Sequence, residues 1–281
     1  MEIFIQVFTY TKIKMAHKIS ISIGISTFIL LLLSCGPSKQ ELAQGKLNRA
    51  EVFLATGDTA SCLLHLDSIA RIYPECKSEI AKATTISSAI YTSQLIKERQ
   101  NLESANTLIG SYLKEFKTEK GEFERYTNYI PNRQVFDKSW SRSYIQVSLN
   151  EKGDLTLASN YYGEQWLSHT SFRIVTELFT VKTDSVPLGT INNHRSDFGE
   201  SKWEKVTYRG EQAEEVIKAI ALNADKKVKA VFKGEGSSTY IMWLEDYDKE
   251  AIKAAYNLSK GFKIKKASEQ KIPELEKKIK S

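Results

Sequence analysis

The stretch from Tyr144 to Tyr162 reads YIQVSLNEKGDLTLASNYY and decides the fold of the half of the chain in which it lies. Apolar residues alternate with polar ones from Tyr144 to Leu149, and a second run of the same kind starts at Leu155. This period of two is typical of half-buried β-strands. Residues 150–154, Asn-Glu-Lys-Gly-Asp, are typical turn formers, so the stretch predicts a β-hairpin.

The residues after the hairpin continue the strand pattern and interrupt it with helical segments. Further strands are predicted at residues 171–175, 178–183, 202–208, 227–232 and 238–244. Residues 211–222 and 248–256 show helical periodicity, and a Lys-rich tail follows the second of them. We therefore expect a mainly antiparallel, sandwich-like β-domain with a few helices and a C-terminal helix.

The chain before the hairpin has the period of helices. From Lys39 to Gly57, apolar residues recur three or four apart on one face, namely Ala43, Leu47, Ala50 and Leu54. A second helix is predicted from Asp58 or Thr59 to Tyr73, and Pro74 ends it. The two helices are expected to form an antiparallel hairpin.

This hairpin resembles a tetratricopeptide repeat. Phe53 precedes Gly57 at the spacing of the repeat, and Cys62, Leu66 and Pro74 follow Gly57 at the spacings of its small, large and closing residues. About three repeats are normally needed to bury a continuous repeat core. The resemblance therefore implies a helical pair that packs on another element rather than a peptide-binding solenoid.

A long third helix is predicted at residues 77–116. Its second half carries apolar residues at heptad-like spacing, namely Leu95, Leu102, Ala105, Ile109, Tyr112 and Phe116. This stripe has two interpretations, a coiled-coil stalk or dimer seam, or packing on the preceding hairpin. The heptad run is short and Glu98 interrupts it, which favours packing on the hairpin.

These patterns predict an α+β protein. A helical segment at 39–125 precedes a β-rich domain at 139–281, and residues 126–138, which include Pro131, are the expected linker.

The N-terminus has the pattern of an export signal. The apolar run from Ile19 to Leu33 is shorter than the roughly 20 residues that a membrane-spanning helix needs. Lys18 precedes the run and small residues follow it, as in a secretory signal peptide. Met15 would start a signal of normal length, so we expect Met15 to be the true initiator.

Leu32-Leu33-Ser34-Cys35 resembles the lipobox of bacterial lipoproteins. The resemblance implies that residues 1–34 are removed as a signal peptide, that the Cys35 thiol carries lipid, and that residues 35–38 are a tether. A simple membrane-anchor helix with an incidental cysteine is the alternative. Gly36 in place of Asp favours the outer membrane, facing either the periplasm or the medium. With this N-terminal signal, the protein resembles Bacteroides-type lipoproteins.

Composition limits the class of partner. The chain has 281 residues, 41% of them hydrophobic, and a formal net charge of +6, which is typical of a globular protein and does not indicate nucleic-acid binding. Cys62 lies near the start of the second predicted helix and Cys76 just past its end. The helix rises about 16 Å from Cys62 to Tyr73, so the two cysteines are too far apart for a disulfide. We expect both to be core residues. No spacing indicates a metal or cofactor site.

Pieces of a Ser/His/Asp site occur around His169-Thr170-Ser171 and in the segment 192–197, which contains His194, Ser196 and Asp197. No nucleophile-elbow motif accompanies them, so no catalytic residue is predicted. The hydrolase alternative requires His169 or His194 within hydrogen-bonding reach of a Ser and an Asp in a cleft.

Tyr161, Tyr162 and Trp166 are the candidate ligand-binding residues. Adjacent aromatic residues cannot all face one side of a strand, so some of them should be exposed or covered by another element. The alternative is that they belong to the core. The acidic run 245–248 fits a helix N-terminus better than a calcium site.

The sequence thus predicts a non-enzymatic envelope lipoprotein, anchored by lipid on Cys35, whose β-domain contacts another protein. The alternative is a glycan- or small-ligand-binding lipoprotein that uses the aromatic residues of the β-domain.

Overall fold

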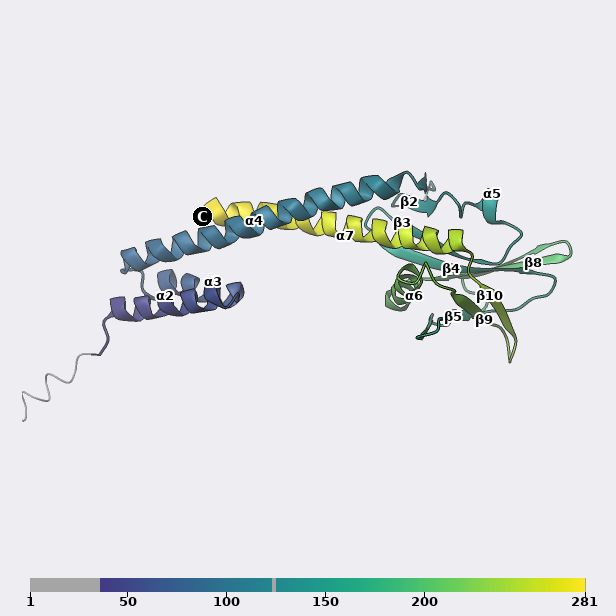
Figure 1. Ribbon diagram of the computed structural model, residues 1–281, viewed down its shortest axis with the longest axis horizontal. Coiled ribbons are helices and arrows are strands. Elements are labelled where there is room, and N and C mark those ends of the chain that lie inside the picture. The colour runs from purple at the N-terminus through teal and green to yellow at the C-terminus, as the bar shows by residue number, and fades with distance from the viewer. Residues whose placement is uncertain (1–35, 123–124, 281) are drawn as a thin grey trace, which may run out of the picture. The chain divides into compact units, whose positions relative to one another are not determined.

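The computed structural model describes residues 36–122 and 125–280, and it confirms the α+β class (Figure 1). The chain divides into two compact units, Met1–Thr92 and Ser93–Ser281. The division falls within one long helix, α4 (Lys77–Leu113). The predicted signal peptide and Cys35 lie outside the described residues.

The first unit is helical. It contains α2 (Lys39–Ala55), α3 (Thr59–Ile72) and the first part of α4, so the predicted helical hairpin is confirmed. Ser38 and Glu41 form a capping box at the start of α2, which satisfies two backbone N–H groups there. Cys62 and Cys76 are free and buried in the core of this unit, as predicted.

The second unit contains two antiparallel sheets. The larger sheet has the strand order β1 (Phe116–Glu119), β2 (Asn128–Pro131), β3 (Tyr144–Asn150), β4 (Leu155–Gly163), β8 (Ser201–Tyr208) and β7 (Asn193–Phe198). The smaller sheet has the order β10 (Thr239–Trp243), β9 (Lys229–Lys233), β5 (Ser171–Val175) and β6 (Thr180–Lys182). The predicted hairpin is β3–β4, with Tyr144 opposite Asn160 and Leu149 opposite Leu155.

Both sheets contribute to one core. The inner face of the larger sheet, which includes Leu157 and Val206, packs in the same cluster as Phe172 and Phe232 of the smaller sheet. Helices α6 (Glu211–Ala221) and α7 (Asp246–Lys280) add further apolar side chains to it, among them Ile217, Ile252 and Leu258. The opposite, outer face of the larger sheet carries residues such as Thr156, Ala158 and Lys205, because successive side chains in a strand alternate.

Helix α7 is much longer than the predicted segment 248–256, because the Lys-rich tail continues it to Lys280. In the second unit, α4 and α7 are in contact: Ile109 lies against Gly261, and Glu98 pairs with Lys271 at 2.9 Å. The apolar stripe of α4 therefore packs on α7. The prediction that this stripe packs on the preceding hairpin is wrong, since the hairpin uses the earlier part of α4, with Ala83 and Ile90.

Three strands were not predicted: β1 and β2 have only four residues each, and β7 has a mainly polar sequence. The expected linker 126–138 lies within the second unit and contains β2 and α5 (Phe136–Ser139). The segment 192–197, expected to be a polar loop, contains most of β7. It was missed because an edge strand with one solvated face has few apolar residues to mark it.

Gly153, in the turn between β3 and β4, lies against α7. Its φ is +84°, and an added Cβ would lie 2.8 Å from the carbonyl oxygen of Ser259. We expect Gly153→Ala to lower the free energy of unfolding by more than about 2 kcal/mol through backbone strain and this clash. Gly199→Ala is the matched control, because Gly199 has a φ of +63° and open space around it. It should cost about 1 kcal/mol. Urea denaturation measures both, and equal losses would contradict the contact with α7.

Candidate functional site

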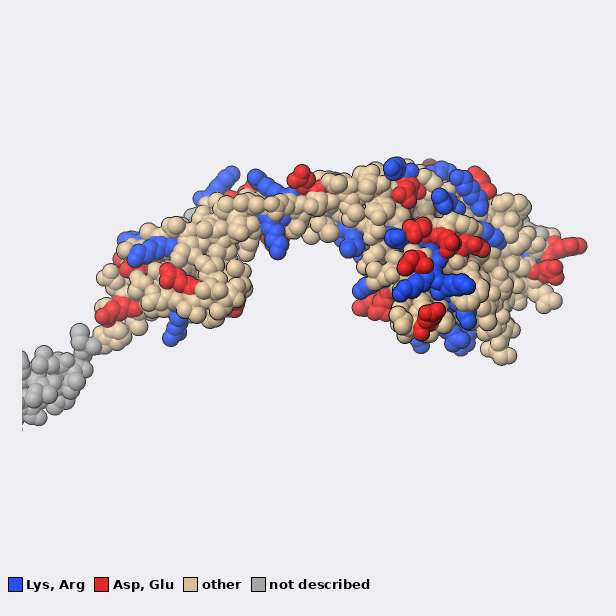
Figure 2. Space-filling view, in the orientation of Figure 1, with Lys and Arg blue, Asp and Glu red and all other residues tan. Residues whose placement is uncertain are grey.

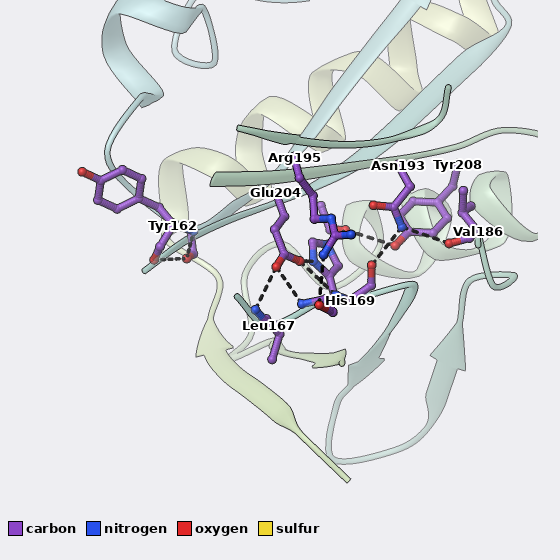
Figure 3. A network of polar contacts seen from close by, with 11 residues as sticks. Tyr162, Leu167, His169, Val186, Asn193, Arg195, Glu204 and Tyr208 are labelled. Carbon is purple, nitrogen blue, oxygen red and sulfur yellow. Dashed lines mark hydrogen bonds and ion pairs between the residues drawn. The ribbon is translucent and has the colours of Figure 1, made fainter. Parts of the chain in front are cut away.

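A buried carboxylate organises the contact between the two sheets. Glu204, on the inner face of β8, is fully buried. Its Oε1 accepts hydrogen bonds from the backbone N–H groups of Leu167 at 2.8 Å and Ser168 at 2.6 Å, and its Oε2 accepts one from the N–H of His169 at 2.9 Å (Figure 3). The segment that leads from β4 to β5 is therefore wrapped around this side chain.

The His169 ring extends the arrangement into a chain of polar side chains. Its Nδ1 lies 2.6 Å from Glu204 Oε2, and its Nε2 lies 2.8 Å from Ser159 Oγ. Ser159 Oγ lies in turn 3.1 Å from the hydroxyl of Tyr208. We call Glu204, His169, Ser159 and Tyr208 the Glu204 network. Acid, imidazole and serine follow one another in the order of a Ser-His-acid triad.

Hydrogen bonds keep the Glu204 carboxyl in its ionised form. Burial raises the pKa of the Glu204 carboxyl, but the hydrogen bonds from His169 and from the backbone outweigh it and hold the pKa below its usual value. An ionised Glu204 accepts a hydrogen bond from His169 Nδ1–H, which leaves Nε2 of the ring facing the Ser159 hydroxyl. Burial raises the pKa of Tyr208, which therefore stays protonated.

Neighbouring polar groups hold the wrapped segment in place. Asn193 donates from Nδ2 to the carbonyl oxygens of His169 at 3.1 Å and Val186 at 3.0 Å. Arg195 donates to the hydroxyl of Ser168 at 3.1 Å (Figure 3). Both residues belong to β7, which thus supports the network from the edge of the larger sheet.

The Glu204 network is sealed from solvent. Ser159, His169 and Glu204 have no exposed surface, and Tyr208 is 4% exposed. The ring of Phe232 stacks on His169 with a centroid distance of 5.0 Å. The hydrolase alternative required a cleft, and a substrate carbonyl has no route to Ser159 Oγ here. The triad-like chain is therefore suited to holding the two sheets together rather than to attacking a substrate.

The other histidine candidate is exposed but incomplete. His194 Nε2 lies 2.8 Å from Ser196 Oγ on the outer face of β7. The neighbouring Asp197 points to the other face, where it pairs with Lys202 at 2.6 Å. Alternation along the strand thus separates the acid from the histidine.

Ser159 and Glu204 were not singled out from the sequence. Ser159 is two residues after Leu157 in β4, and Glu204 is two residues before Val206 in β8. Residues two apart in a strand share a face, so both polar residues occupy core-facing positions. A polar residue at a core-facing position is the signal that would have found them, because buried polar groups require partners.

An open, polar pocket lies on the outer face of the larger sheet, and we call it the outer-face pocket. Its volume is about 550 Å³. Its lining comes from β1, β2, β3, β4 and β8 and from the chain just after β1 and β8: Glu119, Lys120, Gly121, Asn128, Ile130, Gln146, Ser148, Thr156, Ala158, Lys205, Thr207 and Arg209. Most of these side chains carry hydroxyl, amide or charged groups, which indicates a polar ligand.

Lys205 is the central cation of the outer-face pocket. Its side chain is half-buried, and this burial lowers the pKa of its ammonium group, an effect that nearby Glu119 opposes. Within the described residues Lys205 belongs to no ion pair with N and O within 4 Å. Arg209 also lines the pocket and donates one hydrogen bond to Asn192 Oδ1 at 2.9 Å.

Asn160 lies next to Lys205 beneath the outer face. The two residues are directly opposite in the β4–β8 pair. Asn160 is fully buried, and neither its Oδ1 nor its Nδ2 has a hydrogen-bond partner among the described residues. Buried amides without partners are rare in folded proteins.

A second pocket of about 570 Å³ lies between β2 and the start of α7, beside Arg133, Tyr247 and Glu250. The predicted acidic run begins α7 there. Asp248 is fully buried and accepts hydrogen bonds from Arg142 at 2.6 Å and Gln134 at 2.9 Å, so its oxygens are already used. Within residues 36–122 and 125–280, no three His, Cys, Asp or Glu side chains are grouped as metal ligands.

The three predicted ligand-binding aromatics do not share a surface. Tyr161 packs against the core and meets the ring of Tyr240 at 5.1 Å. Tyr162 lies on the outer face and donates to Ser201 Oγ at 2.9 Å. Trp166 is 41% exposed, with Arg195 and Lys202 over its ring. None of the three lines either pocket.

No helix among the described residues is both long and apolar enough to cross a membrane. The chain matches no protein-family model, no curated protein and no solved structure.

Replacement of Glu204 tests the Glu204 network. Glu204→Gln places an amide among N–H donors, and we expect a loss of about 3 kcal/mol in the free energy of unfolding. Because the folded-state pKa of Glu204 is lowered, its contribution is complete above the usual value of 4.5 and is lost as the pH falls below it. Denaturation from pH 7 to pH 3 should show less acid destabilisation in Glu204→Gln. The exposed Glu215→Gln is the control, and equal effects of the two variants would contradict this role.

Proposed function

We propose that this chain is a lipid-anchored envelope protein without catalytic activity, and that its second unit binds a small polar ligand in the outer-face pocket. The observation that carries the proposal is the contrast between two polar sites. The Glu204 network has the groups of a hydrolase but no access, whereas the outer-face pocket has access and unpaired polar groups.

The outer-face pocket has the size of a small-molecule site. Pockets for such ligands usually measure about 300–1,000 Å³, and this pocket measures about 550 Å³. The hydroxyl groups of Ser148, Thr156 and Thr207 make no hydrogen bond within the described part of the chain. These groups can form hydrogen bonds with a ligand without first losing an internal partner.

The visible surface of the second unit gives no indication of nucleic-acid binding. The face of the second unit seen in Figure 2 carries acidic and basic side chains intermixed, without a broad basic area. A polyanion would need such an area to neutralise its phosphates.

The lipid anchor rests on the lipobox-like Leu32–Cys35 segment. Several acyl chains on one cysteine would hold the chain stably on a membrane, where a single chain is marginal. We expect cells fed radioactive palmitate to label the wild-type chain, and Cys35→Ala to be unlabelled and unprocessed. Cys62→Ala is the matched control and should be labelled normally. Equal labelling of wild type and Cys35→Ala would refute the anchor.

Calorimetry on the full chain in detergent tests the ligand site. The probes are D-glucose, D-glucosamine, D-glucuronate and D-glucose 6-phosphate, which share one ring and differ in charge. We expect at least one to bind. Ala158→Trp, which fills the floor of the pocket, should abolish that binding.

Two further variants make this experiment decisive. Thr156→Tyr obstructs the same pocket from a half-buried position and serves if Ala158→Trp does not fold. Thr180→Trp, at an exposed position of β6, is the control and should bind like wild type. The proposal fails if no probe binds, or if the pocket-filling variants bind as well as wild type.

A protein-contact role is the second candidate, and β10 favours it. This strand lies at the edge of the smaller sheet, and its Ile241 and Trp243 side chains are 58% and 56% exposed. Exposed apolar side chains on an edge strand are typical of sites where another chain binds.

A further inference from the structure

We propose that the ligand of the outer-face pocket carries a carboxylate or phosphate group beside several hydroxyl groups, and that Lys205 anchors its charge. This inference rests on the proposed function and adds the chemical class of the ligand.

The charges that line the pocket are mainly positive. Lys120, Lys205 and Arg209 provide three cations, and Glu119 is the only acid among the described residues that line the pocket. Glu119 is already paired with Lys117 at 3.4 Å. The lining therefore has unbalanced positive charge, which favours an anion.

The position of Lys205 explains why this cation would be the anchor. It lies within the sheet, with Asn160 opposite on β4 and His194 opposite on β7. Neither neighbour is an acid, and nearby Glu119 forms no ion pair with Lys205 within 4 Å, so within the described residues the half-buried ammonium group has no directly paired counter-ion. A desolvated cation without a counter-ion is unfavourable, and a bound anion removes that cost.

Arg209 is a second cation on the same face, four residues further along β8 and its continuation. Residues four apart in a strand are separated by about 13 Å. One guanidinium N–H is used by Asn192, and four others remain. Arg209 can therefore contact a second polar group of a ligand whose anion lies at Lys205.

The rest of the lining selects the remainder of the ligand. Thr207 lies between the two cations along β8, whereas Ser148 and Thr156 lie on β3 and β4, between β8 and β2, and the hydroxyl groups of all three both donate and accept. A molecule with several hydroxyl groups matches this lining better than an apolar anion does. Asn160, opposite Lys205, does not line the pocket, and its buried amide has no hydrogen-bond partner among the described residues.

The four probes defined above test the inference on the full chain. D-glucuronate or D-glucose 6-phosphate should bind at least tenfold more tightly than D-glucose and D-glucosamine. The two anionic probes separate the two sources of charge, since a carboxylate site prefers the first and a phosphate site the second. Added salt should weaken the binding.

Variants of Lys205 test whether its charge is responsible for binding the anionic probe. Lys205→Met keeps most of the aliphatic stem and should weaken the anionic probe at least tenfold. Lys205→Arg keeps the charge and should bind within a few-fold of wild type, which separates loss of charge from loss of folding. Lys233→Met, at an exposed position of β9, is the control and should not change the affinity.

The outcomes distinguish the two proposals. If D-glucose or D-glucosamine binds as tightly as the anions, or if Lys205→Met leaves the affinity unchanged, the anion inference is overturned while the binding function stands. If none of the four probes binds, both are overturned.

Discussion

The hydrogen bonding of one buried carboxylate determines how the second unit is built. Glu204 belongs to the larger sheet, and the three N–H groups that it binds lie just before the first strand of the smaller sheet. An ionised carboxylate in a protein interior is tolerated only when its lone pairs are satisfied. The three hydrogen bonds therefore tie the segment just before β5 to β8. The apolar contacts around it then fill the core.

The same constraint leaves the triad-like chain of side chains without access to solvent. A catalytic serine must be reached by its substrate, whereas Ser159 faces the core and shares its oxygen with His169 and Tyr208. The polar groups with access to solvent lie on the opposite face of the same strands. Strand alternation thus divides β4 and β8 into a structural face and a face that is free to bind.

Much of the fold could be predicted from the sequence, because the strong signals are local. The β3–β4 hairpin, α6 and the first helices have clear periodicity and turn residues, and they lie where they were expected. The long-range features could not be read in this way. The apolar stripe of α4 packs on α7, which lies more than 150 residues further along the chain. No sequence pattern near Glu98 or Lys271 indicates that these two side chains form an ion pair.

The candidate sites show the same division. His169 was a candidate residue in the sequence, but its partners Ser159 and Glu204 lie in β4 and β8, and only the fold brings the three together. The outer-face pocket was not predicted, because its lining comes from five strands and from the chain just after two of them, and no segment of it forms a motif. Tyr161 and Tyr162, adjacent in sequence, are placed on opposite faces by the strand itself.

One side chain has a consequence for how this protein behaves at high concentration. Strand β2 pairs with only the last residues of β3, so the earlier part of β3 has no neighbouring strand on that side. Gln134 occupies it: its side chain donates to the carbonyl of Ile145 and accepts from the N–H of Val147. A side-chain amide therefore takes the place of a neighbouring strand. Because another molecule cannot add its own strand there, Gln134 protects the sheet against edge-to-edge aggregation.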